Sequence, residues 1–158
     1  MITTAPLRRD QYRQSEEWEY GPHEAEMDWE RHAQEMERPN WLNYAVYVDG
    51  KFCAAISYEE VEPALISVHV AKEPYTITPR QLADLLIETA DYFYRNGTEE
   101  LQAIIPFGYK PSRRLALRTG MTYRGNVEQG ERYAISKAEY YRLYNVCLLY
   151  TSPSPRDS

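Results

Sequence analysis

The sequence has few of the residues that build disulfide-rich or metal-bound folds. Its two cysteines, Cys53 and Cys147, are too few for a disulfide framework or a cysteine-based metal site. Of its three histidines, His23 and His32 are nine positions apart, which does not place them on one helix face for a shared metal ion. We therefore expect a reduced, intracellular protein that binds no metal.

Long apolar runs and an excess of positive charge are also missing. No segment approaches the roughly 20 apolar residues of a membrane helix, and residues 1–7 lack the apolar core of a signal peptide. The net charge of −6 disfavours nucleic-acid binding driven by overall charge, although it is compatible with a local basic patch. The sequence thus predicts no membrane partner and disfavours a nucleic-acid partner.

What the chain does contain is enough apolar material for one folded domain. It has 158 residues, of which 43% are hydrophobic and 27% charged, and these values are ordinary for a globular protein. Fifteen tyrosines are unusual and predict a surface or cleft rich in amphipathic rings. No internal repeat and no linker is visible, which favours a single domain.

The clearest local pattern is an amphipathic helix between two apolar strands. Thr78, Pro79 and Gln81 form a capping-box start with proline at the first helical position, and Gly97 ends the helix. Its apolar stripe consists of Leu82, Leu85, Leu86, Ala90 and Phe93. The segments 64–70 and 101–105 are short and apolar and predict buried strands on either side. A strand–helix–strand unit of this kind predicts a right-handed crossover between parallel strands.

The other elements surround this unit in the sequence. Asp49-Gly50 predicts a tight hairpin turn, and Ser136 with Glu139 predicts a capping box for a terminal helical turn. The remaining predicted elements are a strand over 2–8, helices over 9–20 and 23–38, hairpin strands over 43–48 and 51–59, a short basic helix over 110–119, and a closing hairpin of strands over 121–125 and 132–135.

The order of these elements resembles the GNAT (acyl-CoA N-acyltransferase) fold over roughly residues 1–144. The most specific piece is 111–121, which is similar to the family's short helix ending in glycine, followed by a strand with a second glycine, here Gly125. The chain is also similar to GNAT-like proteins of tailed phages, including internal virion proteins. The resemblance implies an α/β (α+β) fold with a mixed, mostly antiparallel sheet flanked by helices and a parallel central strand–helix–strand unit.

The resemblance also implies a function, N-acyl transfer from acetyl-CoA to an amine acceptor that the sequence does not identify. In the family an amine attacks the thioester directly. By this resemblance the backbone around Val68 and Val70 holds the pantetheine arm of the cofactor. The start of the following helix, at Thr78, Arg80 and Gln81, is expected to hold the pyrophosphate.

The cofactor loop departs from the family pattern, an Arg/Gln-x-x-Gly-x-Gly/Ala segment. The corresponding residues 74–83 hold no glycine, and Pro79 removes one amide donor. The family's frequent asparagine falls on Tyr109 or Lys110, and its common tyrosine acid falls on Ala116. Two interpretations therefore stay open: an N-acyltransferase with a degenerate pyrophosphate loop, or a non-catalytic phage virion or interaction protein. The expected location is the host cytoplasm or the virion.

Two residues are candidates for acid–base catalysis. His69 on the central strand suits a general base or proton relay, and the alternative is a half-buried sheet histidine. Glu59, near Glu60 and Glu62, suits a proton relay through water, and the alternative is a solvated hairpin acid.

The short basic helix and the C-terminal tyrosines also leave alternatives open. Arg113, Arg114 and Arg118 suit a phosphate or an acidic partner, or form a solvated face. Three tyrosines near the C-terminus suit either core packing or an interface: Tyr140, Tyr141 and Tyr144.

The C-terminal segment has the character of a processing scar. Residues 147–157 resemble the translation of the transposase mosaic end and adapter that are used in tagmentation sequencing libraries. We therefore expect the domain to span residues 1–145 and residues 146–158 to form a disordered tail that contributes nothing to the core.

Overall fold

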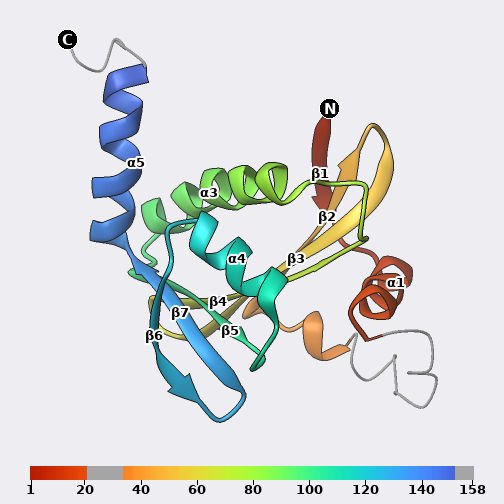
Figure 1. Ribbon diagram of the computed structural model, residues 1–158. Helices are drawn as coiled ribbons and strands as arrows, with labels where there is room; N and C mark the ends of the chain where they lie inside the picture. The colour runs from red at the N-terminus through yellow and green to blue at the C-terminus, as the bar shows by residue number, and fades with distance from the viewer. Residues whose placement is uncertain (21–33, 152–158) are drawn as a thin grey trace. The chain divides into compact units, whose positions relative to one another are not determined.

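The computed structural model describes residues 1–20 and 34–151 (Figure 1). The strands are β1 (Ile2–Pro6), β2 (Trp41–Val48), β3 (Lys51–Glu62), β4 (Leu65–Lys72), β5 (Glu100–Ile105), β6 (Thr122–Val127) and β7 (Gly130–Ser136). The helices are α1 (Arg9–Tyr20), α3 (Pro79–Arg95), α4 (Lys110–Arg118) and α5 (Lys137–Thr151). Most of the helix predicted over 23–38 lies outside the described residues. The α5 helix extends past Asn145, where the sequence predicts the end of the domain.

The strands form a seven-stranded sheet in the order β1-β2-β3-β4-β5-β7-β6. The sheet is mostly antiparallel, contains the parallel pair β4 and β5, and is flanked by helices. The amides of Glu99 and Glu100 donate to the carbonyl of Ala64, at 2.8 and 3.1 Å, where these two strands begin. The α/β (α+β) fold predicted from the sequence is confirmed.

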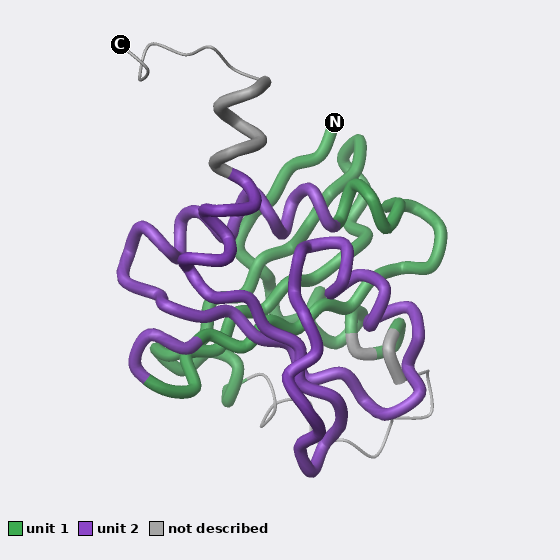
Figure 2. Tube along the Cα trace, turned by 60° about the vertical axis from the view of Figure 1, so that its left-hand side comes forward, with its two compact units in different colours: residues 1–62, 66–82 green, residues 63–65, 83–158 purple. Residues whose placement is uncertain are grey.

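The chain divides into two compact units (Figure 2). Unit 1 comprises residues 1–62 and 66–82, and unit 2 comprises residues 63–65 and 83–158.

Unit 1 is built on a meander of β1, β2 and β3. Asp49 and Gly50 have φ values of 50° and 83°, so both central turn residues are left-handed and the predicted hairpin turn is confirmed. The pairing of β2 with β3 shifts by one residue between Val46 and Tyr47, which marks a β-bulge. Both faces of this hairpin are buried at its centre, because the neighbouring residues Ala45 and Val46 on β2, and Cys53 and Ala54 on β3, point to opposite faces and are all buried.

Tyrosine hydroxyls form hydrogen bonds that join the elements of unit 2. Tyr94 on α3 donates to the carbonyl of Ile135 at 2.7 Å, and Tyr140 on α5 donates to the carbonyl of Ile87 at 2.7 Å. Burial raises the pKa of Tyr140 to about 12. Tyr144 donates to the carbonyl of Thr119 at 2.6 Å. Tyr140 and Tyr144 therefore pack α5 against the rest of unit 2. Of the two alternatives for the C-terminal tyrosines, this arrangement is core packing.

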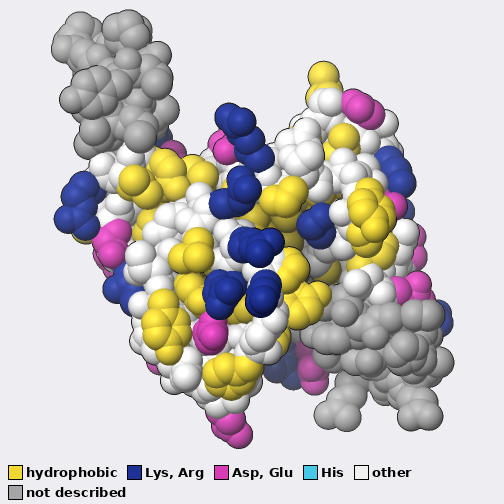
Figure 3. All heavy atoms as spheres, viewed as in Figure 1, with side chains coloured by type: hydrophobic (Ala, Val, Ile, Leu, Met, Phe, Trp, Pro, Cys, Tyr) yellow, Lys and Arg dark blue, Asp and Glu magenta, His cyan; other side chains and the backbone are white. Residues whose placement is uncertain are grey.

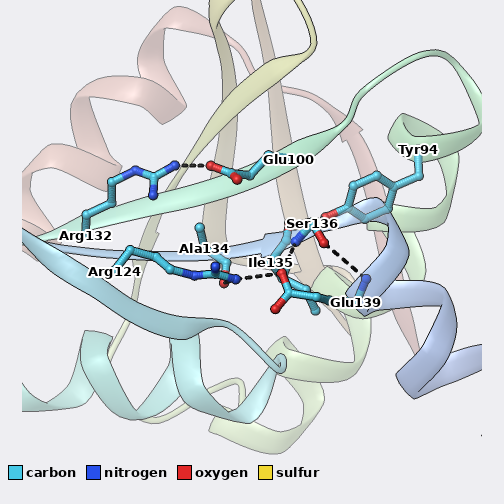
Figure 4. Close-up of polar contacts among 8 residues, drawn as sticks. All are labelled: Tyr94, Glu100, Arg124, Arg132, Ala134, Ile135, Ser136 and Glu139. Carbon is cyan, nitrogen blue, oxygen red and sulfur yellow. Dashed lines mark hydrogen bonds and ion pairs between the residues drawn. The ribbon is translucent and has the colours of Figure 1, made fainter.

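The capping box predicted at the start of α5 is also present. The carboxylate of Glu139 accepts from the Ser136 amide at 2.8 Å, and the Glu139 amide donates to the Ser136 hydroxyl at 3.1 Å (Figure 4). The same carboxylate accepts from Arg124 at 2.6 Å. These bonds, led by the one from the Ser136 amide, hold the pKa of Glu139 below its ordinary value. A further ion pair links Arg132 on β7 to Glu100 on β5 (Figure 4).

The apolar stripe of α3 is buried only in part. Leu82, Ala90 and Phe93 are buried, but Leu85 and Leu86 are only half-buried. The sequence periodicity identified the correct face of the helix. It did not show how much of that face is covered.

Gly130 opens β7 at a point of close backbone approach. The pairing of β5 with β7 places Ile105 opposite Glu131, so the Ile105 carbonyl lies against Gly130. A Cβ at Gly130 would overlap the Ile105 carbonyl oxygen and lie 3.0 Å from the Cα of Pro106. Only a residue without a side chain fits this position.

Candidate functional site

Three neighbouring strands of unit 1 bring Trp41, Glu59 and His69 together. Trp41 on β2 and Glu59 on β3 are partners in the strand register. His69 on β4 places its Nε2 atom 3.5 Å from Oε1 of Glu59, and its ring stacks on Trp41 with centroids 5.3 Å apart and planes 29° apart. The His69 side chain is 48% exposed and that of Glu59 is 28% exposed. The cluster is therefore open to a substrate or to water.

The pKa of the His69 imidazole lies below its ordinary value. Desolvation of the imidazolium lowers this pKa more than the nearby Glu59 carboxylate raises it. His69 is therefore mostly neutral at pH 7 and is able to accept a proton. Glu59 favours the tautomer with hydrogen on Nε2, which leaves Nδ1 as the accepting atom.

The sequence predicted His69 and Glu59 as candidates, and the structure brings these two together. Glu60 and Glu62, the other acids considered, are exposed and are not part of the cluster. Sequence reasoning missed Trp41. A partial signal was present, because a regular hairpin around Asp49-Gly50 brings Trp41 opposite Tyr58, the residue next to Glu59.

Replacing Trp41 with alanine is expected to raise the pKa of His69 toward 6.5, because the indole shields one face of the imidazole from water. Glu59→Gln is expected to move the pKa further down, because it removes the charge that stabilises the imidazolium. Proton NMR titration of the ring signals measures both shifts, with His69→Gln identifying the resonance among three histidines.

Trp41→Phe is the matched control and should keep the wild-type value. An unchanged pKa in Trp41→Ala would contradict the shielding role. Because the pKa of His69 is lower in the folded chain than in the unfolded chain, the unfolded chain takes up this proton first. The contribution of His69 to stability is therefore present above pH 6.5 and is lost as the pH falls through the folded pKa.

In the loop that follows β4, three backbone carbonyls point toward the ammonium group of Lys72. The Lys72 ammonium donates to the carbonyls of Glu73, Pro74 and Ile77, at 3.4, 3.2 and 3.4 Å. The Glu73 carboxylate in turn accepts from Lys51 at 3.1 Å and from the Thr76 hydroxyl at 2.6 Å. An anion-binding nest needs converging amides, whereas this loop converges carbonyls on a cation.

The start of α3 satisfies most of its own amides. The Thr78 amide donates to Oε1 of Gln81 at 3.0 Å, and the Gln81 amide donates to the Thr78 hydroxyl at 3.1 Å. The predicted capping box is therefore confirmed. The Leu82 amide donates to the Thr78 carbonyl at 3.0 Å, and Pro79 has no amide hydrogen. Of the amides from Thr78 to Leu82, only that of Arg80 is left for a ligand.

The residues predicted to bind the cofactor thus differ in what they offer. Thr78 and Gln81 are bonded to each other. Arg80 is exposed and forms no ion pair with any described residue. Val68 and Val70 are half-buried on β4.

The short helix α4 contains no tyrosine. Ala116, which the sequence resemblance aligned with a tyrosine acid, is buried. Tyr109 precedes the helix without a side-chain capping bond.

Within residues 1–20 and 34–151, no three His, Cys, Asp or Glu side chains are grouped to hold a metal ion. No described helix is long and apolar enough to cross a membrane.

Comparisons with known proteins complete this description. No family model and no curated protein sequence matches the chain. Solved structures do match over most of its length. The aminoglycoside acetyltransferase AAC(6')-Ib in complex with coenzyme A superposes with a TM-score of 0.71 at 11% identity, covering 91% of this chain and 99% of that chain.

Two further structures agree. The PaiA N-acetyltransferase from Thermoplasma acidophilum with coenzyme A has a TM-score of 0.68 at 14% identity, covering 86% of this chain and 99% of that chain. The ribosomal-protein-S18-alanine N-acetyltransferase from Escherichia coli has a TM-score of 0.64 at 17% identity, covering 86% and 94%. The chain has the GNAT fold. On this fold, Trp41, Glu59 and His69 form the candidate functional site.

Proposed function

We propose that this GNAT-fold protein is an N-acyltransferase in which His69 and Glu59 remove the proton from an amine acceptor. The observation that carries the proposal is the 3.5 Å contact between a mostly neutral imidazole and a carboxylate on adjacent strands. Both side chains are partly exposed, so an amine or a bridging water has access to them. The acceptor is a primary amine whose further identity the site does not specify.

The chain's own residues account for the proton transfer. Acetyl-CoA, when bound, supplies the acyl group as a thioester. The amide bond forms as the carbon–sulfur bond of the thioester breaks, and coenzyme A leaves as a thiolate. The amine nitrogen loses a proton in this step, and His69 accepts that proton at Nδ1, directly or through one water. Glu59 fixes the tautomer through Nε2 and stabilises the imidazolium that results.

The residues present fit the acyl donor only in part. A diphosphate at the start of α3 meets one free amide and the guanidinium of Arg80, where the GNAT pattern offers a glycine nest. The preceding loop presents carbonyl oxygens that are bonded to Lys72 and would repel an anion. We therefore infer a degenerate pyrophosphate loop and weak acetyl-CoA binding.

The same observation favours a second function. Lys72 occupies the carbonyls of the loop, and Thr78 and Gln81 occupy amides at the start of α3. A GNAT-fold protein with these contacts in its cofactor loop is suited to a non-catalytic role. The resemblance to tailed-phage proteins suggests a virion or interaction component. In that case the protein acts in the virion, and as an enzyme it acts in the host cytoplasm.

Rising acetyl-CoA is expected to leave the melting temperature nearly unchanged, because weak binding adds little stability. A ligand at 100 times its dissociation constant stabilises a protein by about 2.7 kcal/mol, which a thermal-shift assay detects easily. Calorimetric titration with acetyl-CoA and free coenzyme A gives the affinity directly.

Arg80→Ala is the paired variant for this experiment. A concentration-dependent rise in the melting temperature that disappears in Arg80→Ala would contradict the degenerate loop. It would instead assign the pyrophosphate to the Arg80 side chain. Acyl transfer to a panel of primary amines then separates the two functions, since only the enzyme forms an amide product.

A further inference from the structure

The α4 helix carries a row of positive charges and no acids. Lys110, Arg114 and Arg118 are spaced by four residues, so they lie on one helix face about 6 Å apart along its axis. All three are exposed, and Arg113 adds a half-buried fourth cation beside them. Figure 3 shows Lys and Arg side chains gathered over α4.

These four cations have no anionic partner in the part of the chain that the structure describes. Three other arginines of unit 2, Arg95, Arg124 and Arg132, each form an ion pair. Like charges four residues apart repel one another, and cations in the first turn oppose the helix dipole. The row therefore reduces the stability of the helix, and an anionic ligand would relieve this repulsion.

Exposed aromatic rings stand in the segments that precede and follow α4. Phe107 and Tyr109, which directly precede α4, are 57% and 47% exposed, and Tyr123 on β6 is 52% exposed. The Tyr123 ring lies 5.7 Å from that of Tyr133. Burial raises the pKa of Tyr133, and the positive charge of Arg113 opposes this rise in part. Cations that hold phosphates and exposed rings that stack on bases are the two parts of a single-strand binding surface.

We propose that this face of α4, with Phe107, Tyr109 and Tyr123, binds single-stranded nucleic acid, a function separate from acyl transfer. The overall charge of −6 is not evenly distributed along the chain. Residues 1–82 contain eight Lys or Arg and fifteen Asp or Glu, whereas residues 83–144 contain nine and eight. An acidic protein segment would use the cations but would have no need of three exposed rings. The rings therefore favour the nucleic acid.

The test is fluorescence anisotropy with a labelled oligodeoxythymidine of about 12 nucleotides, which is within the usual site size. Three phosphate contacts predict a slope of about −2 for the logarithm of the binding constant against the logarithm of salt concentration. Arg114→Ala is expected to reduce the magnitude of this slope by about 0.7. Tyr109→Ala is expected to weaken binding at least about fivefold.

Arg114→Glu separates binding from folding. It places an acid between Lys110 and Arg118, which favours the helix, and it is expected to weaken binding at least about tenfold. Arg142→Glu makes the same charge change at an exposed position on α5 and should leave binding unchanged. Absence of binding by the wild-type chain, equal losses in Arg114→Glu and Arg142→Glu, or displacement of the oligonucleotide by polyglutamate at equal charge would each overturn the proposal.

Discussion

Gly130→Ala is expected to lower the free energy of unfolding by about 4 kcal/mol, beyond the usual overpacking range of about 1–3 kcal/mol. The new Cβ would overlap the carbonyl oxygen of Ile105 and lie 2.7 Å from its carbonyl carbon. Backbone atoms held in a strand pair cannot rotate away as a side chain can. The methyl group is therefore accommodated only by separating β5 from β7 at this end.

Urea denaturation measures the loss, and Gly125→Ala is the matched control. Gly125 has a φ of 110° and open space around it, so alanine there is expected to cost only the backbone strain, about 1–2 kcal/mol. Equal losses at the two positions would show that β5 and β7 accommodate the methyl group without separating.

His69→Gln is expected to reduce the rate of acyl transfer by about 10²–10⁴, the usual contribution of a general base. Glutamine keeps a polar side chain at the exposed position but cannot accept the proton. Initial rates with saturating primary amine and excess acetyl-CoA measure the loss. In the wild type the rate should rise with pH through a value below 6.5, because the pKa of His69 is lowered and the neutral form is active.

Glu60→Gln is the control, because Glu60 is an exposed acid that follows Glu59 on β3 and lies outside the cluster. It should retain wild-type rates. If His69→Gln retained them as well, the base would have to be another residue. If the wild type formed no amide above the uncatalysed background, the non-catalytic function would be favoured.

Much of the fold could be predicted because local signals agreed with one another. The Asp49-Gly50 turn and the capping boxes at Thr78 and Ser136 form as the sequence indicates, since each depends on residues only a few positions apart. The GNAT fold follows from the order of elements that these signals delimit.

The candidate site could be predicted only in part, because its third member depends on an irregularity. A regular two-residue hairpin would pair Trp41 with Tyr58. The bulge between Val46 and Tyr47 shifts the pairing by one residue, so Trp41 meets Glu59 and lies on the same face of the sheet as His69. Bulges depend on tertiary packing and leave no clear pattern in a sequence.

The sequence also did not reveal where two backbone segments approach closely or which tyrosines are buried. The predicted closing hairpin places Gly130 between its two strands, whereas the structure requires glycine there because of a carbonyl on another strand. The tyrosines were expected to enrich a surface, yet Tyr94 and Tyr140 are buried and donate to carbonyls. Such contacts join residues that are distant in sequence, and composition alone does not reveal them.

The two compact units differ in their chromophores. All three tryptophans, Trp18, Trp29 and Trp41, fall within the residues of unit 1, and unit 2 has none. Indole emission during denaturation therefore reports on unit 1 alone, whereas far-ultraviolet ellipticity reports on the helices of both. Different midpoints from the two signals would show that the units unfold separately, and a common midpoint would indicate one cooperative transition.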